Sequence, residues 1–148
     1  MSLQLTSDAF ANGQSIPAKY SCLGKNTSPA LTWTEPPAGT RSFALIVDDP
    51  DAPMGTWVHW LLYNISADVR NLQEGFAAQD PIAVGKNSSR NLAYDGPCPP
   101  SGTHRYYFKI FALDTALSLP PGTSKDQLLK DIEGHILAQS ELMGTFSK

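Results

Sequence analysis

The stretch SFALIVDDPDAPMGTWVHWLLYNI, residues 42–65, holds two apolar runs joined by a segment of prolines, aspartates and a glycine. The runs 42–49 and 57–65 are rich in β-branched and aromatic residues, and Pro, Gly, Asn or Asp bound each of them. Because both are almost continuously apolar, we expect central strands covered on two faces. Residues 3–10 and 104–114 have similar composition, so the sequence predicts a mainly β fold.

Length and charge narrow the class of protein. A chain of 148 residues fits one domain, residues 1–148, with a core that needs no metal or disulfide. Eleven basic and fourteen acidic residues give a net charge of -3, and the absence of a basic run argues against nucleic-acid partners and anionic membrane surfaces. With no signal-like N-terminus and no apolar run of about 18 residues, we expect a cytoplasmic protein without integral membrane association.

One segment near the C-terminal end of the sequence predicts a helix. Ser124 followed by Gln127 is a capping box at a helix start. The apolar stripe of this helix would consist of Leu128, Leu129, Ile132 and Ile136. We expect the helix to pack on the sheet, with His135 in a structural role, bonded to Asp131 one turn earlier.

Two histidines, His59 and His104, lie near the starts of two of the predicted strands. Strict alternation along 57–65 places Trp57, His59, Leu61 and Tyr63 on one face. In the strand that starts at His104, alternation places Tyr106 beside it and Arg105 on the opposite face. If the two strands lie close together with matching faces, two imidazoles, a phenol and an indole line one pocket. Such donors on an apolar floor, with backbone amides of the glycine-containing loop 96–103, suit a phosphate-like anion.

Two carboxylates precede the first histidine. We expect Asp49 or Asp51 to accept an N–H from His59 or His104, which fixes the tautomer and orientation of that ring. The other carboxylate would meet an ammonium group, to which Trp57 adds cation–π attraction. A zwitterionic phosphoethanolamine would satisfy all of these groups.

Two other chemistries compete with anion binding. Two His and two Asp could bind zinc, but no compact ligand spacing supports a metal site. Cys98 with His104 and Asp49 could form a nucleophile, base and orienting group, yet Cys98 lies between prolines with nothing nearby to favour its thiolate. We expect Cys22 and Cys98 to approach closely enough to pair, which a Cα separation beyond about 7 Å would exclude.

Three motifs together resemble a known family. DPDAP at 49–53, WVHW at 57–60 and GPCPPSGTHRYYF at 96–108 resemble the phosphatidylethanolamine-binding protein family, also called the Raf kinase inhibitor protein family. NTSPALTW at 26–33 and GHILAQSELMGTF at 134–146 are similar to its bacterial and archaeal branch. The resemblance covers nearly the whole chain in order.

The resemblance implies a large antiparallel sheet with a smaller second sheet, a peripheral helix and a small anion pocket near the end of the sheet. In the family this pocket is lined by residues that correspond to Asp49, His59 and His104. Wall or supporting positions correspond to Asp51, Pro53, Trp57, Gly96, Pro99 and Tyr106. We expect no cofactor and no metal.

The implied function is the binding of a small phosphate-bearing anion or phospholipid headgroup, with a regulatory role and no enzymatic activity. The alternative is a protein-partner modulator, of the kinase or serine-protease inhibitor type, that uses the pocket rim. Only MGT separates DPDAP from Trp57, shorter than in the animal proteins, which weakens the kinase-inhibitor interpretation. A small hydrolase or metal-dependent enzyme ranks last, and the sequence leaves open whether the chain forms a homodimer.

Overall fold

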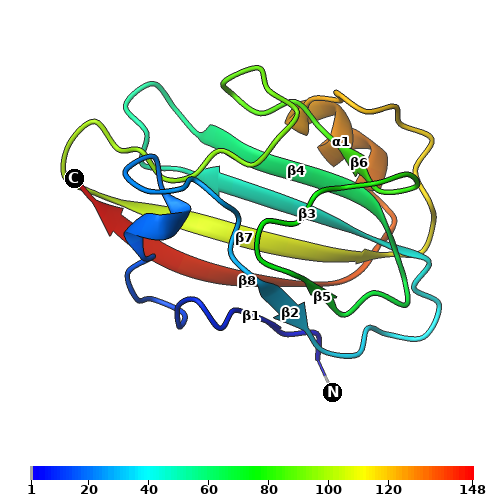
Figure 1. Cartoon of the computed structure of the whole chain (residues 1–148). Coiled ribbons are helices and arrows are strands. Elements are labelled where there is room, and N and C mark those ends of the chain that lie inside the picture. The colour runs from blue at the N-terminus through cyan, green and yellow to red at the C-terminus, as the bar shows by residue number, and fades with distance from the viewer. Residues whose placement is uncertain (1) are drawn as a thin grey trace.

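The computed structural model describes residues 2–148. Its elements, in chain order, are β1 (Leu5–Thr6), the 3-10 helix η1 (Ala18–Tyr20), β2 (Leu31–Trp33), β3 (Ser42–Asp49), β4 (Trp57–Ser66), β5 (Asn71–Leu72), β6 (Ala83–Val84), β7 (Thr103–Leu113), α1 (Lys125–Ile132) and β8 (Ile136–Ser147). The four long strands β3, β4, β7 and β8 run nearly the length of the molecule in Figure 1.

These strands form a large and a small sheet. The large sheet has the order β6-β4-β3-β7-β8, and the small sheet has the order β1-β2-β5. All pairings between these strands are antiparallel. Every residue of the central strand β3 is buried, as expected for a strand covered on two faces. The mainly β fold with a large and a small antiparallel sheet is therefore confirmed.

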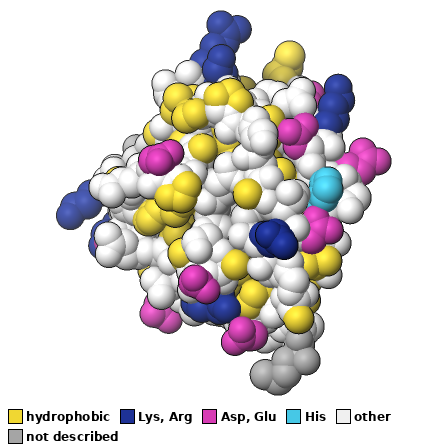
Figure 2. Space-filling model, turned by 90° about the vertical axis from the view of Figure 1, so that its right-hand side faces the viewer, with side chains coloured by type: hydrophobic (Ala, Val, Ile, Leu, Met, Phe, Trp, Pro, Cys, Tyr) yellow, Lys and Arg dark blue, Asp and Glu magenta, His cyan; other side chains and the backbone are white. Residues whose placement is uncertain are grey.

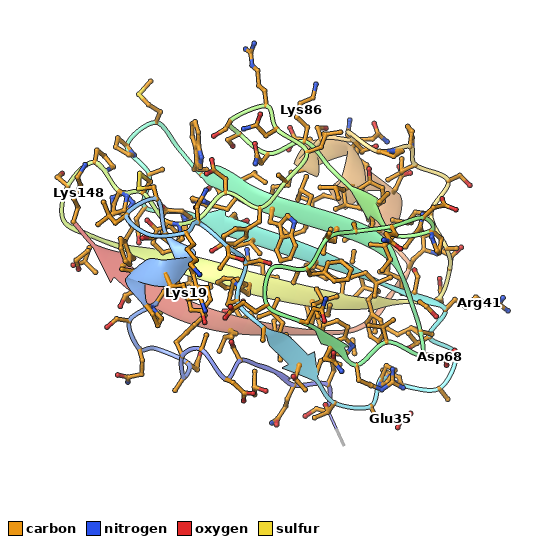
Figure 3. All side chains as sticks on the ribbon, in the orientation of Figure 1. Lys19, Glu35, Arg41, Asp68, Lys86 and Lys148 are labelled. Atoms are coloured by element: carbon orange, nitrogen blue, oxygen red, sulfur yellow. A yellow bond between two sulfur atoms is a disulfide. The ribbon has the colours of Figure 1, made fainter. Side chains whose placement is uncertain are left out.

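The large sheet separates two apolar cores. Leu31, Trp33 and Leu72 of the small sheet pack against Phe43, Trp60 and other residues on one face of the large sheet. On the opposite face, α1 contributes Leu128 and Ile132 to a second core with residues such as Tyr63. Side chains fill the space between the layers in Figure 3, whereas exposed Arg41 and Lys86 point outward.

The predicted helix is shorter than expected. Ser124 caps α1 by accepting the N–H of Gln127 at 3.2 Å, but the Gln127 side chain bonds Asp131, so only half of the capping box forms. The helix stops at Ile132 because Gly134 adopts φ +82°, a left-handed conformation that commonly ends helices. Within residues 2–148, no helix combines the length and apolar character needed to cross a membrane.

The predicted helical positions of His135 and Ile136 are wrong. Ile136 begins β8, a strand that the sequence analysis did not predict, and this strand pairs with β7 along its whole length. His135 lies in the connection between α1 and β8, where Nδ1 bonds Asp114 at 2.7 Å and not Asp131.

The packing of α1 can be tested with two neighbouring leucines. Leu128 is fully buried, whereas Leu129 is 39% exposed. We expect Leu128→Ala to lower the free energy of unfolding by about 3 kcal/mol, because it leaves a cavity beneath the helix. Leu129→Ala, the matched control, should cost less than about 1 kcal/mol. Equal losses in urea unfolding would show that α1 does not pack on this face.

Candidate functional site

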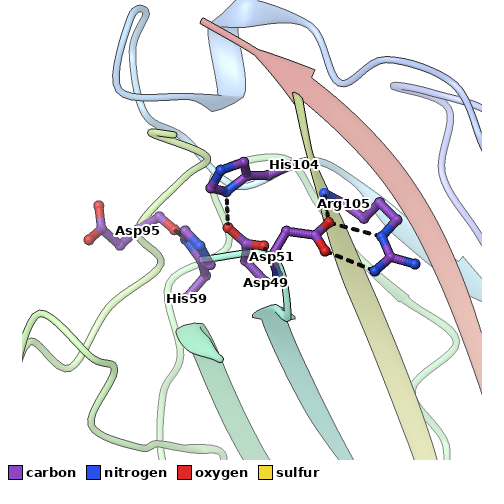
Figure 4. Close-up of polar contacts among 6 residues, drawn as sticks. All are labelled: Asp49, Asp51, His59, Asp95, His104 and Arg105. Carbon is purple, nitrogen blue, oxygen red and sulfur yellow. Dashed lines mark hydrogen bonds and ion pairs between the residues drawn. The ribbon is translucent and has the colours of Figure 1, made fainter. Parts of the chain in front are cut away.

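Three strand ends meet at one end of the large sheet. β4 and β7 are each antiparallel to β3, so the starts of β4 and β7 both lie beside the end of β3. A cavity of about 400 Å³ opens there. Asp49 comes from the end of β3, His59 from the start of β4 and His104 from the start of β7, and Figure 4 shows the three converging.

The cavity unites eight of the nine predicted site residues: Asp49, Pro53, Trp57, His59, Gly96, Pro99, His104 and Tyr106. Asp51 is the exception. The remaining lining residues, which the sequence analysis did not place in the binding site, are Cys22, Ala52, Met54, Ser89, Asp95, Cys98 and Pro100.

His59 occupies a β-bulge. Val47 pairs with Trp60 and Asp48 pairs with Val58, which leaves His59 as an extra residue in β4. Its ring meets the edge of Tyr106, with 5.2 Å between ring centroids. The extra residue breaks the strict alternation along β4.

The predicted grouping of Leu61 and Tyr63 on the same face as His59 is therefore wrong. Those two side chains lie in the core beneath α1, on the other side of the sheet. The alternation predicted along β7 is correct, because Tyr106 belongs to the core between the sheets. Arg105 lines a separate groove on the opposite face.

A backbone carbonyl fixes the ring of His59. Nδ1 lies 2.5 Å from the carbonyl oxygen of Asp95, which can only accept, so Nδ1 carries the proton. Burial lowers the pKa of His59, and the bond to Asp95 opposes that shift only in part. The ring is therefore neutral near pH 7, and no residue in the described chain bonds its Nε2.

A carboxylate fixes the ring of His104. Nδ1 of His104 donates to Oδ2 of Asp49 at 2.7 Å, and both side chains are less than a tenth exposed. The other oxygen of Asp49 accepts the N–H of Asp51 at 2.7 Å. As in His59, Nδ1 already has a hydrogen-bond partner, and no described residue bonds Nε2. The predicted carboxylate–imidazole bond thus forms between Asp49 and His104.

Asp51 does not face the cavity. Its carboxylate accepts two bonds from the Arg105 guanidinium, at 2.8 and 2.9 Å, and one from the Arg105 backbone N–H at 2.9 Å. These bonds hold the pKa of Asp51 down, at about 2. The expectation that Asp51 binds a ligand's ammonium group is wrong, because Arg105 already supplies its cation. Asp49 and Asp51 instead attach the 49–53 turn to consecutive residues of β7, as Figure 4 shows.

The loop 94–100 closes the other side of the cavity. Gly96 donates its N–H to Oδ1 of Asn26 at 2.8 Å, and a Cβ at position 96 would lie 2.0 Å from the Tyr20 carbonyl oxygen. Only glycine fits so close to another backbone segment. Asn26 takes the Gly96 amide and positions 97, 99 and 100 are prolines, so these four positions offer no backbone N–H to an anion.

A disulfide fastens the same loop. Cys22 and Cys98 are bonded, with their Cα atoms 5.4 Å apart, well inside the limit of about 7 Å. Both cysteines are exposed and line the cavity. The bond leaves Cys98 without the free thiol that a cysteine nucleophile requires. Residues 2–148 also contain no group of three or more His, Cys, Asp or Glu side chains placed to hold a metal ion.

Tyr106 is a neighbour of both imidazoles. Its ring makes an edge-type contact with His59 and stacks with His104, with centroids 6.4 Å apart in the second pair. Its hydroxyl is buried and has no hydrogen-bond partner in the described part of the chain. Burial raises the pKa of Tyr106, so the hydroxyl keeps its proton and remains a donor. An unpaired buried hydroxyl costs free energy unless a ligand or water bonds it.

Sequence reasoning missed Asp95 because its main contribution is a carbonyl oxygen, which every residue carries. The Asp95 side chain accepts hydrogen bonds from Ser89 at 2.7 Å and Asn26 at 3.4 Å, which hold this residue in the cavity wall. The position of Asp95 directly before the predicted pocket loop 96–103 was the only available signal.

Comparisons with known proteins agree with this geometry. The model of the phosphatidylethanolamine-binding protein family matches residues 6–147. A relative named UPF0098 protein from Chlamydia muridarum is 48% identical over 151 residues, covering 99% of both chains. A protein of the same name from Methanothermobacter thermautotrophicus is 44% identical over 150 residues, again covering 99% of both.

Solved structures give the same result. A protein described as a homologue of phosphatidylethanolamine-binding protein, from Chlamydia trachomatis, superposes with a TM-score of 0.94 at 47% identity, over 99% of this chain and 98% of that one. Escherichia coli YbcL, described as a new member of the mammalian family, superposes with a TM-score of 0.92 at 31% identity, over 100% of this chain and 99% of that one.

The fold and site define a two-sheet β protein with a paired-histidine pocket at the end of its large sheet. The chain belongs to the phosphatidylethanolamine-binding protein family.

The bond between Asp51 and Arg105 predicts a pH-dependent contribution to stability. The folded-state pKa of Asp51 is depressed, so its contribution is complete above about pH 4 and is lost as the pH falls toward 2. Because Arg105 is half exposed, solvent screens the pair, and we expect Asp51→Asn to cost about 1 kcal/mol at pH 7. Urea unfolding should show that the difference in unfolding free energy between Asp51→Asn and the wild type is smaller at pH 2.5 than at pH 7. Asp8→Asn, at an exposed aspartate, is the control, and an unchanged difference at low pH would contradict the assignment.

Proposed function

We propose that the cavity binds a phosphate-bearing anion, either a free small molecule or the headgroup of a phospholipid, and that this binding serves a regulatory role. One observation carries the proposal: two imidazoles are fixed through Nδ1, and neither Nε2 has a partner among the described residues. Both rings line one cavity. Their Nε2 atoms are therefore two polar groups, from two strands, that one ligand can meet.

The charge of the cavity determines how an anion would bind. No lysine or arginine lines it, so its cationic groups can only be His59 and His104 in their protonated forms. A neutral ring whose Nδ1 carries the proton offers a lone pair at Nε2, which repels an anionic oxygen. A protonated ring donates from Nε2 instead. Anion binding should therefore bring a proton to His59, whose ring is neutral in the free protein, while Asp49 lies beside His104 as a counter-charge.

The walls indicate a ligand larger than inorganic phosphate. The cavity of about 400 Å³ falls within the range of small-molecule sites. Trp57, Pro53 and Pro99 add apolar surface beside the polar groups. These walls suit an anion with an organic substituent, such as a phosphoethanolamine group. The name of the family supports the same ligand class.

Binding should weaken as the pH rises. Glycerophosphoethanolamine is a suitable probe because its phosphodiester keeps one charge between pH 5 and 8, so only the protein titrates. We expect affinity to increase at least tenfold from pH 8 to pH 5.5, because the bound His59 ring must acquire a proton. Calorimetry in buffers of different ionisation enthalpy should show net proton uptake.

His59→Ala and His104→Ala should abolish this binding, whereas His135→Ala, at the half-exposed histidine outside the cavity, should retain it. Binding that is independent of pH, or unaffected by loss of either cavity histidine, would refute the proposal.

A further inference from the structure

The disulfide between Cys22 and Cys98 forms part of the cavity wall. It joins the loop after η1 to the loop 94–100, across a sequence separation of 76. Both cysteines are exposed and both line the cavity, so a dissolved thiol can reach the bond. Thiol–disulfide exchange depends on such access, and exposed disulfides are the class from which labile and regulatory ones are drawn.

Hydrogen bonds hold the first half of the loop 94–100. The N–H of Asp95 donates to the carbonyl oxygen of His59 at 3.0 Å. The carbonyl oxygen of Pro97 accepts the N–H of Cys22 at 3.1 Å. These bonds hold the part of the loop whose Asp95 carbonyl orients the His59 ring.

The second half of this loop lacks such bonds. Residues 98–101 make no hydrogen bond with the rest of the described chain, in part because Pro99 and Pro100 carry no N–H. Cys98, Pro99 and Pro100 nevertheless line the cavity. The disulfide is therefore the link that ties this part of the wall to the opposite loop.

Breaking the disulfide requires a reductant, for which a small thiol suffices. One thiolate of the reductant attacks a sulfur of the protein disulfide and releases the other cysteine as a thiolate, which takes up a proton. A second reductant thiol then displaces the mixed disulfide. The products are two protein thiols and one disulfide of the reductant, so two electrons pass from the reductant to the protein.

Release of the wall segment 98–101 should weaken binding without abolishing it. A segment that is free to move must become ordered when a ligand fills the cavity, and the entropy cost of that ordering lowers affinity. His59 and His104 lie on β4 and β7, which do not depend on the disulfide for their place in the sheet. Reduction therefore acts on the wall and leaves the two imidazoles in position.

We propose that the bond between Cys22 and Cys98 is a thiol-exchange site that controls the cavity. The oxidised form holds the wall segment in place, and reduction by a small thiol releases it and weakens anion binding. The effect on affinity rests on the proposed function, because it acts on the same cavity. The release of the wall is independent of that function, since it follows from the bonds of the loop alone.

The opposite end of the molecule provides an internal control. The sequence contains two cysteines, and both lie at the cavity, so a thiol reacts with the protein only there. Figure 2 shows the opposite end, a surface of apolar side chains interspersed with acidic and basic ones. β7 runs from the cavity toward that end, and Asp114, which follows β7, donates its N–H to the carbonyl oxygen of His135 at 3.0 Å.

Amide hydrogen exchange measures the release of the wall. The Cys22 amide reports on the link between the two loops, because it is bonded to the Pro97 carbonyl. We expect this amide to exchange about tenfold faster in protein reduced with dithiothreitol than in oxidised protein, whereas the Asp114 amide should exchange equally in both. Equal rates for Cys22 would overturn the release. Faster exchange at both amides would show that the disulfide holds the whole fold, which contradicts a local effect.

Glycerophosphoethanolamine tests the effect on the cavity. The oxidised protein should bind this probe about fivefold more tightly than the reduced protein. The double variant Cys22→Ser, Cys98→Ser should bind it like the reduced protein and should not respond to dithiothreitol. A response in that variant would show that the thiol acts elsewhere and would contradict the proposal.

The outcomes separate this proposal from the anion site itself. Equal affinity of the oxidised and reduced proteins would overturn the control of binding and leave the anion cavity intact. Failure of both forms to bind the probe would overturn the proposed function, while Cys22 exchange would still decide whether the wall is released. A disulfide that stays intact in glutathione buffers as reducing as the cytosol would contradict a regulatory thiol-exchange site.

Discussion

The site depends on how the buried carboxylate of Asp49 is satisfied. An ionised carboxylate in a protein interior is costly unless hydrogen bonds and opposite charge compensate it. Asp49 is 3% exposed, at the point where the central strand leaves the sheet. Its two oxygens receive the N–H of Asp51 and Nδ1 of His104. These bonds define the turn after β3 and its position against β7, and they leave Nε2 of His104 for the cavity.

Much of the architecture could be predicted from local pattern. The central strands and the β7 alternation follow from continuous or period-two apolar runs, which report burial directly. β8 was missed because several of its inward positions are small or polar residues, Ala138, Ser140 and Gly144 among them. Gly144 is required there by packing, since a Cβ would lie 2.5 Å from Ile16. Gly134 likewise ended the helix where an apolar spacing alone suggested that it continued.

The site was predictable where the chemistry lies in side chains and unpredictable where it lies in backbone geometry. The bulge at His59 depends on pairing between two strands, which the alternation rule ignores. The carbonyl of Asp95 carries no residue-type signal, and Arg105 became the partner of Asp51 only through three-dimensional proximity. The exposed disulfide also bears on location, because such bonds are rare in a reducing cytosol and weigh against the cytoplasmic expectation.

The proposed anion site depends on the Nε2 atoms of His59 and His104. The most direct test is long-range ¹H–¹⁵N NMR of the imidazole nitrogens near pH 7, with and without glycerophosphoethanolamine. In the free protein we expect Nδ1 of His59 to be protonated and Nε2 not to be. With ligand bound, Nε2 of His59 should become protonated and the Nε2 signals of both cavity rings should shift, while the ring of His135 stays unchanged. Unaltered Nε2 signals in the cavity rings at saturating ligand would contradict anion binding by these two rings.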